Sequence, residues 1–345
     1  MSFRITTNMS MATYRHNLNK TNMQLSDSRN TVLTQRNFNS YADDPASATQ
    51  AFRLRRAYWQ TSTHLNNSSD TYTKFNTAWV SLGAIVDDLS DKTAQVSALA
   101  GITGTAGAGR TALGHVLIET SESVIQSMNA QYGEQFIFAG NDALNVPFSW
   151  GPNGTLLYRG IDVASKEAAD QAALKEMASE VQYIDIGLGM KESSPGQVIE
   201  GSAFNTSLPG IDILGYGVDK DGDPKNLALL MRQLGEIFAN CDATTGAYNP
   251  PSDEEVANRL YTKLKEAHDL TTEKYVELDT RAQFLTTNTS RLTTQKAALN
   301  EQILSVEQVD LAEAITDFSW QQYCYNAALK VGNQLLGQSL IDYMN

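Results

Sequence analysis

Cysteine and long apolar runs are scarce in this chain of 345 residues. Its 2 cysteines, Cys241 and Cys324, lie far apart and outside any spacing typical of a metal site, which argues against a disulfide framework. No stretch approaches the roughly 20 apolar residues of a membrane-spanning helix. The first residues are polar and rich in Thr and Asn, without the apolar core of a secretory signal. These absences alone predict a cytoplasmic protein, unless a dedicated machine exports the chain without cleaving it.

An excess of basic residues is also missing. Asp and Glu number 39 against 26 Lys and Arg, which gives a formal net charge of -13. A nucleic-acid or anionic-membrane partner needs a basic face, so we expect neither partner. The short run Arg53, Leu54, Arg55 and Arg56 is the exception, and we interpret it as the solvated face of a helix.

Residue patterns typical of enzymes are missing too. The 4 histidines are scattered, with no pair at helical ligand spacing and no HExxH motif. Segment 104–111 has the spacing of a phosphate-binding loop, but Arg110 stands where a lysine is needed and no apolar strand precedes it. The run 219–223 alternates Asp residues like the start of a calcium loop, yet Pro224 replaces the required glycine. We therefore expect a protein that is not an enzyme and has no catalytic, cofactor-binding or metal-binding residues.

Seven-residue apolar repeats occupy both ends of the chain. The N-terminal series is Met11, Leu18, Leu25 and Val32, with Tyr14, Thr21 and Ser28 in the second seam position. The C-terminal series are Leu311, Phe318, Tyr325 and Gly332, and Ile315, Leu329, Leu336 and Tyr343, interrupted by Gln322, with Leu340 beside them. Such a repeat puts one stripe on a helix, and that stripe must be buried against another helix. We therefore predict that the two ends pack on each other as one coiled coil or on neighbouring copies, and that their apolar residues are the assembly interface.

The segments between these ends follow a nested order. A helix is expected over residues 5–36 and a second from Asp44, where Asp44 is a good N-cap and Pro45 suits the first turn, to about Leu99. Residues 101–109 break that helix, and residues 110–132 resume it. Helical patterns return at 224–240 and from about Asp253, where Leu285, Leu292, Leu299 and Val306 carry a heptad stripe.

The period changes in the middle of the chain. Residues 135–139 and 155–158 read as a strand and a returning strand. Residues 166–223 are richer in Gly and in short β-type runs such as 181–186 and 211–214, so we expect a small inserted domain that its neighbours do not need in order to fold.

Three motifs resemble one known family. The segment YADDPASATQAFRLRR (41–56) resembles the rod junction of bacterial flagellins and of the flagellar hook-associated protein 3 family, with Asp43, Asp44 and Pro45 at the junction. The stretch from Val306 to the end is similar to their shared terminal helix. The run QYGEQFIFAGND, followed by Pro147, Phe148 and LLYRG, resembles the hairpin of the hook-associated proteins rather than flagellin.

The resemblance implies a mainly α-helical, elongated coiled-coil rod with a β-hairpin and a small inserted β-rich domain. We expect an inner terminal domain over 1–42 and 305–345, an outer helical rod over 43–165 and 224–304, and the inserted domain over 166–223.

The same resemblance implies a structural subunit that joins hook to filament by self-assembly. It would leave the cell through the flagellar export apparatus without a cleaved signal peptide. Its implied partners are itself, flagellin, hook-associated protein 1 and an export chaperone, with no cofactor. A flagellin-type filament subunit is the alternative within the family, and a cytoplasmic helical scaffold is the alternative outside it.

Overall fold

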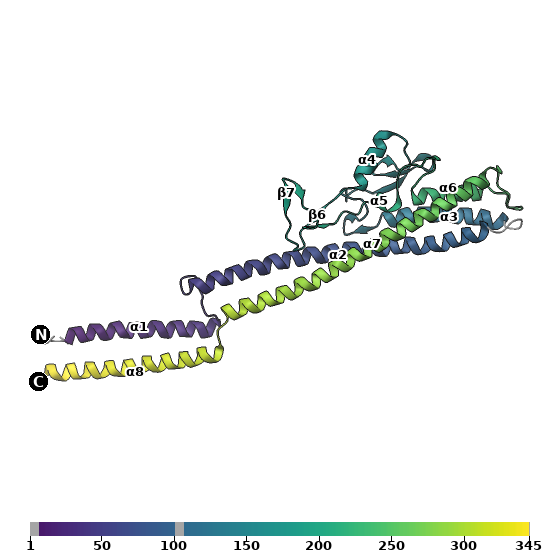
Figure 1. Ribbon diagram of the computed structural model, residues 1–345. Helices are drawn as coiled ribbons and strands as arrows, with labels where there is room; N and C mark the ends of the chain where they lie inside the picture. The colour runs from purple at the N-terminus through teal and green to yellow at the C-terminus, as the bar shows by residue number, and fades with distance from the viewer. Residues whose placement is uncertain (1–6, 101–106, 345) are drawn as a thin grey trace. The chain divides into compact units, whose positions relative to one another are not determined.

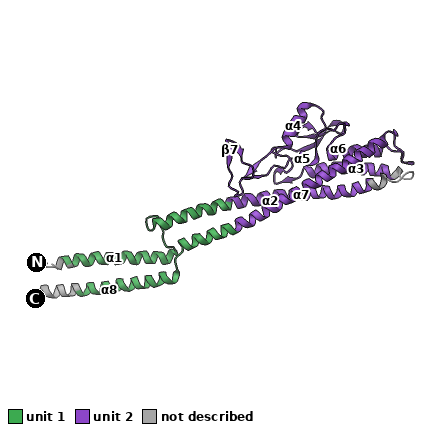
Figure 2. Ribbon diagram, viewed as in Figure 1, with its two compact units in different colours: residues 1–62, 294–345 green, residues 63–293 purple. Residues whose placement is uncertain are grey.

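The computed structural model describes residues 7–100 and 107–344, and these form mainly helices (Figure 1). The chain divides into two compact units, unit 1 with residues 1–62 and 294–345 and unit 2 with residues 63–293 (Figure 2). Helices α2 (Pro45–Ala100) and α7 (Asp253–Glu307) each contribute residues to both units. The helix predicted from Asp44 and the one predicted from Asp253 are therefore present.

Unit 1 is built on the two terminal helices. Helix α1 (Thr7–Thr34) packs against α8 (Leu311–Met344), and the pair runs side by side in Figure 1. The start of α2 and the end of α7 contact each other in the same unit. Arg55 pairs with Glu307 at 2.5 Å, and the Lys296 ammonium lies 5.3 Å from the Tyr58 ring centroid. These contacts, together with α1 on α8, give unit 1 two antiparallel helix pairs.

Unit 2 contains the rest of α2 and α7 together with α3 (Gly107–Met128) and α6 (Leu227–Ala239). The buried side of α2 repeats every seven residues through Ser68, Phe75, Leu82, Leu89 and Val96. Facing residues of α7 contact that side in antiparallel order. The Ser68 hydroxyl lies 3.2 Å from the Thr289 hydroxyl, and the Trp79 ring stacks on Tyr275 with centroids 5.4 Å apart. A heptad seam therefore continues inside unit 2, as the Leu285 and Leu292 repeat indicated.

Helices α3 and α6 approach each other unusually closely. A Cβ atom added at Gly235 would stand 2.7 Å from the Gly114 carbonyl oxygen, a distance that real Cβ atoms do not show. The two backbones can therefore meet only because both residues lack a side chain.

The strands of unit 2 are short and antiparallel. Strand β1 (Gln131–Tyr132) pairs with β2 (Gln135–Phe136), and β3 (Phe148–Trp150), β4 (Leu156–Tyr158) and β5 (Ile161–Asp162) form a three-stranded sheet with β4 in the middle. A 3-10 turn, η1 (Pro152–Gly154), joins β3 to β4. The strand at 156–158 is thus confirmed, but it pairs with β3 and β5 rather than returning onto β2. Residues 137–139 are buried outside any named strand, because a run without polar alternation belongs in a core.

Residues 166–223 contain both strands and helices. Helix α4 (Ala168–Ala178) is followed by two strand pairs, β6 (Tyr183–Ile184) with β9 (Phe204–Asn205) and β7 (Glu192–Ser194) with β8 (Gln197–Val198). The β-type run expected at 211–214 is wrong, since these residues form α5 (Gly210–Leu214). Pro209 before the helix and Gly215 after it, with φ of 84°, are the start and stop signals that outweigh the β propensity of Ile211 and Ile213.

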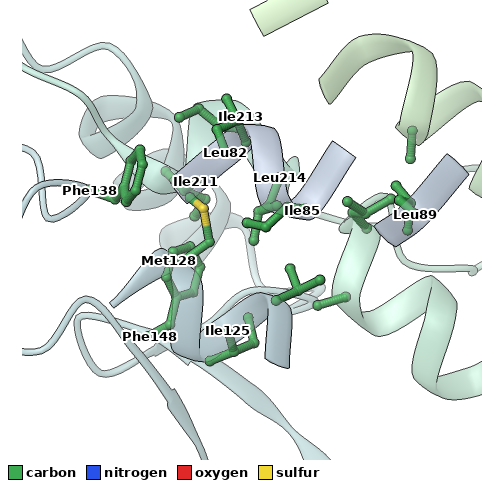
Figure 3. Close-up of a cluster of buried hydrophobic side chains, with 14 of the residues drawn as sticks. Leu82, Ile85, Leu89, Ile125, Met128, Phe138, Phe148, Ile211, Ile213 and Leu214 are labelled. Atoms are coloured by element: carbon green, nitrogen blue, oxygen red, sulfur yellow. The ribbon is translucent and has the colours of Figure 1, made fainter. Parts of the chain in front are cut away.

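One core serves the whole of unit 2. Side chains from α2, α3, the loop between β2 and β3, and α5 meet in the cluster of Figure 3, with Leu82, Met128, Phe138 and Ile211 fully buried. Residues of 166–223 belong to this cluster, among them Leu174, Ile186 and Leu214. The sequence led us to expect that the rest of unit 2 folds without residues 166–223. The shared core indicates instead that it needs them.

Candidate functional site

The apolar stripe of α1 faces α8. Both predicted seam positions, from Met11 to Val32 and from Tyr14 to Ser28, are half-buried, while most of the remaining side chains of α1 are exposed. The Tyr14 hydroxyl donates a hydrogen bond to the Ala328 carbonyl oxygen at 3.1 Å. The N-terminal repeat therefore packs inside the chain, and each stripe residue keeps a minor part of its surface open to solvent.

Helix α8 uses only one of its two predicted series against α1. Phe318 and Tyr325 are half-buried and Gly332 is buried, together with a second series that the sequence analysis missed: Ala314, Gln321 and Ala328. The series predicted one residue further along is exposed, with Ile315 at 47% and Leu329 at 43%. Ile315 and Leu329 therefore lie outside the seam with α1, which the smaller residues at 314 and 328 line instead.

Leu311, at 42%, is exposed as well. Leu336, Leu340 and Tyr343 lie in α8, but outside the residues whose side chains the structure describes. That Leu311, Ile315 and Leu329 contact other molecules stays a prediction.

Gly332 fits directly under the ring of Tyr14. A Cβ atom at this position would overlap the Tyr14 hydroxyl oxygen and stand 2.9 Å from its Cε1 atom. A side chain at position 332 would therefore displace the Tyr14 ring where the two terminal helices approach, and the spacing of the repeat alone did not reveal this.

The junction residues hold the turn before α2. Asp44 accepts hydrogen bonds through Oδ1 from the backbone N–H of Ala46 at 3.0 Å and of Ser47 at 3.1 Å, and Pro45 is the first helical residue. Hydrogen bonds from the Ser47 side chain and backbone hold the pKa of Asp44 below its ordinary value. Asp43 accepts through Oδ2 from the N–H of Asn39 at 3.0 Å and of Ser40 at 2.9 Å. The two carboxylates therefore fix a tight turn and cap a helix, as predicted for Asp44.

Hydrogen bonds from Asn37 join the segment before this turn to the break between α7 and α8. The Asn37 side-chain amide donates to the carbonyl oxygens of Val306 at 3.2 Å and Gln308 at 2.9 Å. Its backbone N–H donates to the Glu307 carbonyl oxygen at 2.9 Å. Asp310 caps α8 by accepting from the N–H of Ala312 at 2.9 Å. Neither residue was predicted from the sequence. Asp310 with Glu313 has the spacing of a capping box, a signal that could have revealed it.

The alternating aspartates form a salt-bridged turn. Asp219, Asp221 and Asp223 place ligand atoms within 4.8 Å of one another, but the Lys263 ammonium lies among them, 2.8 Å from Asp221 and 2.6 Å from Asp223. Arg259 adds two hydrogen bonds to Asp223. Burial lowers the pKa of Lys263, but hydrogen bonds to the three carboxylates outweigh it and leave that pKa above its ordinary value. A protein cation therefore occupies the position that a metal ion would need.

The remaining candidates serve the fold. The Arg110 guanidinium donates to the Gly246 carbonyl oxygen at 2.5 Å and lies over the Tyr248 ring, and residues 101–106 of the glycine-rich segment lie outside the described residues. Cys241 is buried, which raises the pKa of its thiol, and it lies far from Cys324 in sequence. Within residues 7–100 and 107–344, no helix is both long and apolar enough to span a membrane.

Comparisons with known proteins give matches only among solved structures. No family model and no curated protein sequence matches the chain. A structure described as a flagellar hook-associated protein of Vibrio parahaemolyticus matches with 15% identity and a TM-score of 0.54, over 76% of this chain and 99% of the other. FlgL of Xanthomonas campestris matches with 12% identity and a TM-score of 0.51, over 73% and 99%.

Flagellar hook associated protein-3 of Legionella pneumophila matches with 9% identity and a TM-score of 0.51, over 73% of this chain and 98% of the other. Identities this low establish a shared fold and nothing finer. The fold class predicted from the sequence is confirmed: the chain has the mainly α-helical, flagellin-like fold of these flagellar hook-associated proteins.

Proposed function

We propose that the chain is a structural subunit of the bacterial flagellum, without enzymatic activity, that assembles through its terminal helices and joins the hook to the filament. The shared fold supports a flagellar role, because the matching solved structures are hook-associated proteins. The Asp43, Asp44 and Pro45 turn and the hairpin motif favour the junction protein over a filament subunit.

The observation that carries the proposal is the exposed apolar face of α8. Leu311, Ile315 and Leu329 stay exposed beside the face that packs on α1, and Trp320, Tyr323 and Val331 stay exposed further around the helix. Trp320 and Tyr323 are 62% and 67% exposed, and their rings stack with centroids 5.9 Å apart. Exposed apolar side chains gathered on one helix mark an interaction site, and their burial contributes about 25 cal/mol per Å². A neighbouring subunit that covers them supplies the free energy of assembly.

The partners follow from this role. The subunit contacts further copies of itself, flagellin on the filament side and hook-associated protein 1 on the hook side, and an export chaperone covers its apolar helix before secretion. The subunit leaves the cell through the flagellar export apparatus and acts outside it. An acidic chain of net charge -13 needs neither nucleic acid nor membrane for this role.

Deleting the gene in its own bacterium tests the proposal. The deletion strain should assemble hooks without attached filaments, release filament subunits into the medium and fail to swim, and the restored gene should reverse all three effects. Electron microscopy of the purified chain then separates the two family roles, since a junction protein should stay monomeric or form short assemblies, whereas a filament subunit should form long filaments. Normal swimming of the deletion strain would contradict the proposal.

A further inference from the structure

The net negative charge of the chain comes from unit 2. Residues 1–62 and 294–345 carry 10 Lys and Arg and 9 Asp and Glu, whereas residues 63–293 carry the remaining 16 and 30. Unit 1 is therefore nearly neutral, and unit 2 holds the whole excess of acidic groups. Opposite local charges on the two units would favour contact between unit 1 of one copy and unit 2 of another.

An arginine and aromatic patch lies on the part of α2 that belongs to unit 1. We define this arginine patch by Phe52, Arg53, Arg56 and Trp59. Phe52 and Trp59 are 69% and 68% exposed, and they share one helix face with Arg56 because residues four and three apart are neighbours on a helix. Arg53 and Arg56 form no ion pair with any residue that the structure describes, in contrast to Arg55, which binds Glu307. Arginine and large aromatic side chains are the residue types enriched at the centres of protein interfaces.

A complementary face lies on the part of α7 that belongs to unit 2. We define this acidic stripe by Glu266, Asp269, Leu270, Glu273 and Val276. Leu270 and Val276 are 61% and 57% exposed, and the three carboxylate residues are exposed beside them. Glu266 and Glu273 lack a basic partner among the described residues. The acidic stripe therefore resembles the arginine patch, since both interleave apolar and charged side chains. The charges of the stripe are negative and those of the patch are positive.

We propose that the arginine patch of one copy binds the acidic stripe of a second copy. The inference rests on the proposed function and adds a second contact to the exposed face of α8. Two different surfaces meet, so the contact is head-to-tail, and each bound copy presents a new arginine patch or acidic stripe to the next. Charge pairs that form only when the apolar side chains around them are buried give such a contact its specificity.

A disulfide trap in assembled flagella tests the contact directly. The variant carries Arg56→Cys and Glu273→Cys with Cys324→Ser, while Cys241 is buried and stays. After mild oxidation, a non-reducing gel should show dimers, trimers and larger species, and either cysteine substitution alone should not give this ladder. A disulfide within one chain would not raise the mass. Swimming cells whose flagella contain the variant but give no ladder would overturn the proposal.

Charge exchange provides the second test. The reversals Arg53→Glu with Arg56→Glu, and Glu266→Arg with Glu273→Arg, should each lower the fraction of swimming cells at least tenfold, and the fourfold variant should restore swimming. The matched control Lys191→Glu with Lys225→Glu changes the net charge as much as the first reversal and should swim normally.

The outcomes separate the hypotheses. Loss of swimming only in the first reversal, without a ladder, would assign the arginine patch to another acidic partner and overturn the second copy as occupant. If the wild-type chain is absent from purified flagella, the proposed function itself fails. If it is present and both reversals swim, only this inference fails.

Discussion

Asp44 and Asp310 each cap the helix that follows, on the two chain segments that meet in unit 1. Each stands directly before a helix and accepts hydrogen bonds from its first turn, at 3.0 Å from Ala46 and 2.9 Å from Ala312. Both caps can be predicted from local sequence, because a helix cap involves neighbouring residues only. The hydrogen bonds of Asn37 could not be predicted in this way, since its partners lie about 270 positions away in the chain.

At the same scale, a side chain at position 332 should disturb the contact with Tyr14. Gly332→Ala places a methyl group against Tyr14, so we expect the contact between α1 and α8 to loosen at a cost of about 1–3 kcal/mol, typical of overpacking. Hydrogen exchange should then rise in both terminal helices and stay unchanged in unit 2. Adding Tyr14→Ala should recover much of the protection. Equal exchange rates in Gly332→Ala and the wild type would show that the two helices do not meet in this way.

The aspartate turn predicts a pH dependence. The hydrogen bond from Arg259 is the main reason that the pKa of Asp223 lies below its ordinary value, and Lys263 adds to it. A carboxylate with a depressed folded-state pKa stabilises the fold above its unfolded pKa, near 4, and that stability is lost as pH falls through the folded value. Lys263→Met should therefore lower the melting temperature by a few degrees at pH 7. The difference from the wild type should shrink below about pH 4, where the carboxylates become protonated. A difference that persists unchanged at pH 3 would mean that packing, not charge, is responsible.

At the scale of elements, the helices were predictable and their partners only in part. Local signals at Asp44, Pro45 and Asp253 placed the starts of α2 and α7, and the seven-residue repeat identified the face of α1 that α8 covers. The repeat in α8 did not identify the covered face in full. Ala314 and Ala328 lie toward α1, whereas the apolar Ile315 and Leu329, one position later, face away from it. A pattern reports that a face is apolar, not which molecule covers it.

The exposed face of α8 should be needed for assembly but not for folding. Ile315→Asp and Leu329→Asp change side chains that are 47% and 43% exposed in the chain, so thermal unfolding of the purified protein should stay within about 0.5 kcal/mol of wild type, as for other surface changes. In the assembled state the new carboxylate would be buried without a partner, and swimming should be abolished. The exposed control Lys330→Ala should swim. A swimming Leu329→Asp strain would remove this face from the interface.

Segment 166–223 should be required for the stability of unit 2. Its buried Leu and Ile side chains, among them Leu174 and Ile211, each contribute about 1.5–3 kcal/mol, so losing several exceeds the 5–15 kcal/mol stability of a typical domain. Replacing the segment with a short Gly/Ser linker should abolish cooperative unfolding measured by circular dichroism. Replacing only residues 190–200, which contain the exposed pair β7 and β8, should leave the melting curve unchanged. A shortened chain that still melts cooperatively would restore the inserted-domain expectation.

At the scale of the whole molecule, the sequence motifs resemble those of the flagellar proteins whose fold the chain shares. The motifs lie at the ends and in the hairpin, and the structural likeness extends over 73% or more of the chain. The shared core of unit 2 was not predictable, because it joins α2, α3 and α5 across more than a hundred residues of chain. The division into an inner terminal domain, an outer rod and an inserted segment stays a proposal beside the two compact units.

The central claim is that the chain joins the hook to the filament. Immunogold electron microscopy of intact flagella tests it most directly, with an epitope inserted in the exposed turn between β7 and β8 so that the label reports the chain in its assembled place. We predict a single narrow band of gold where the hook ends and the filament begins. Labelling along the whole filament would identify a filament subunit, and flagella without label in cells that express the tagged chain would contradict the account.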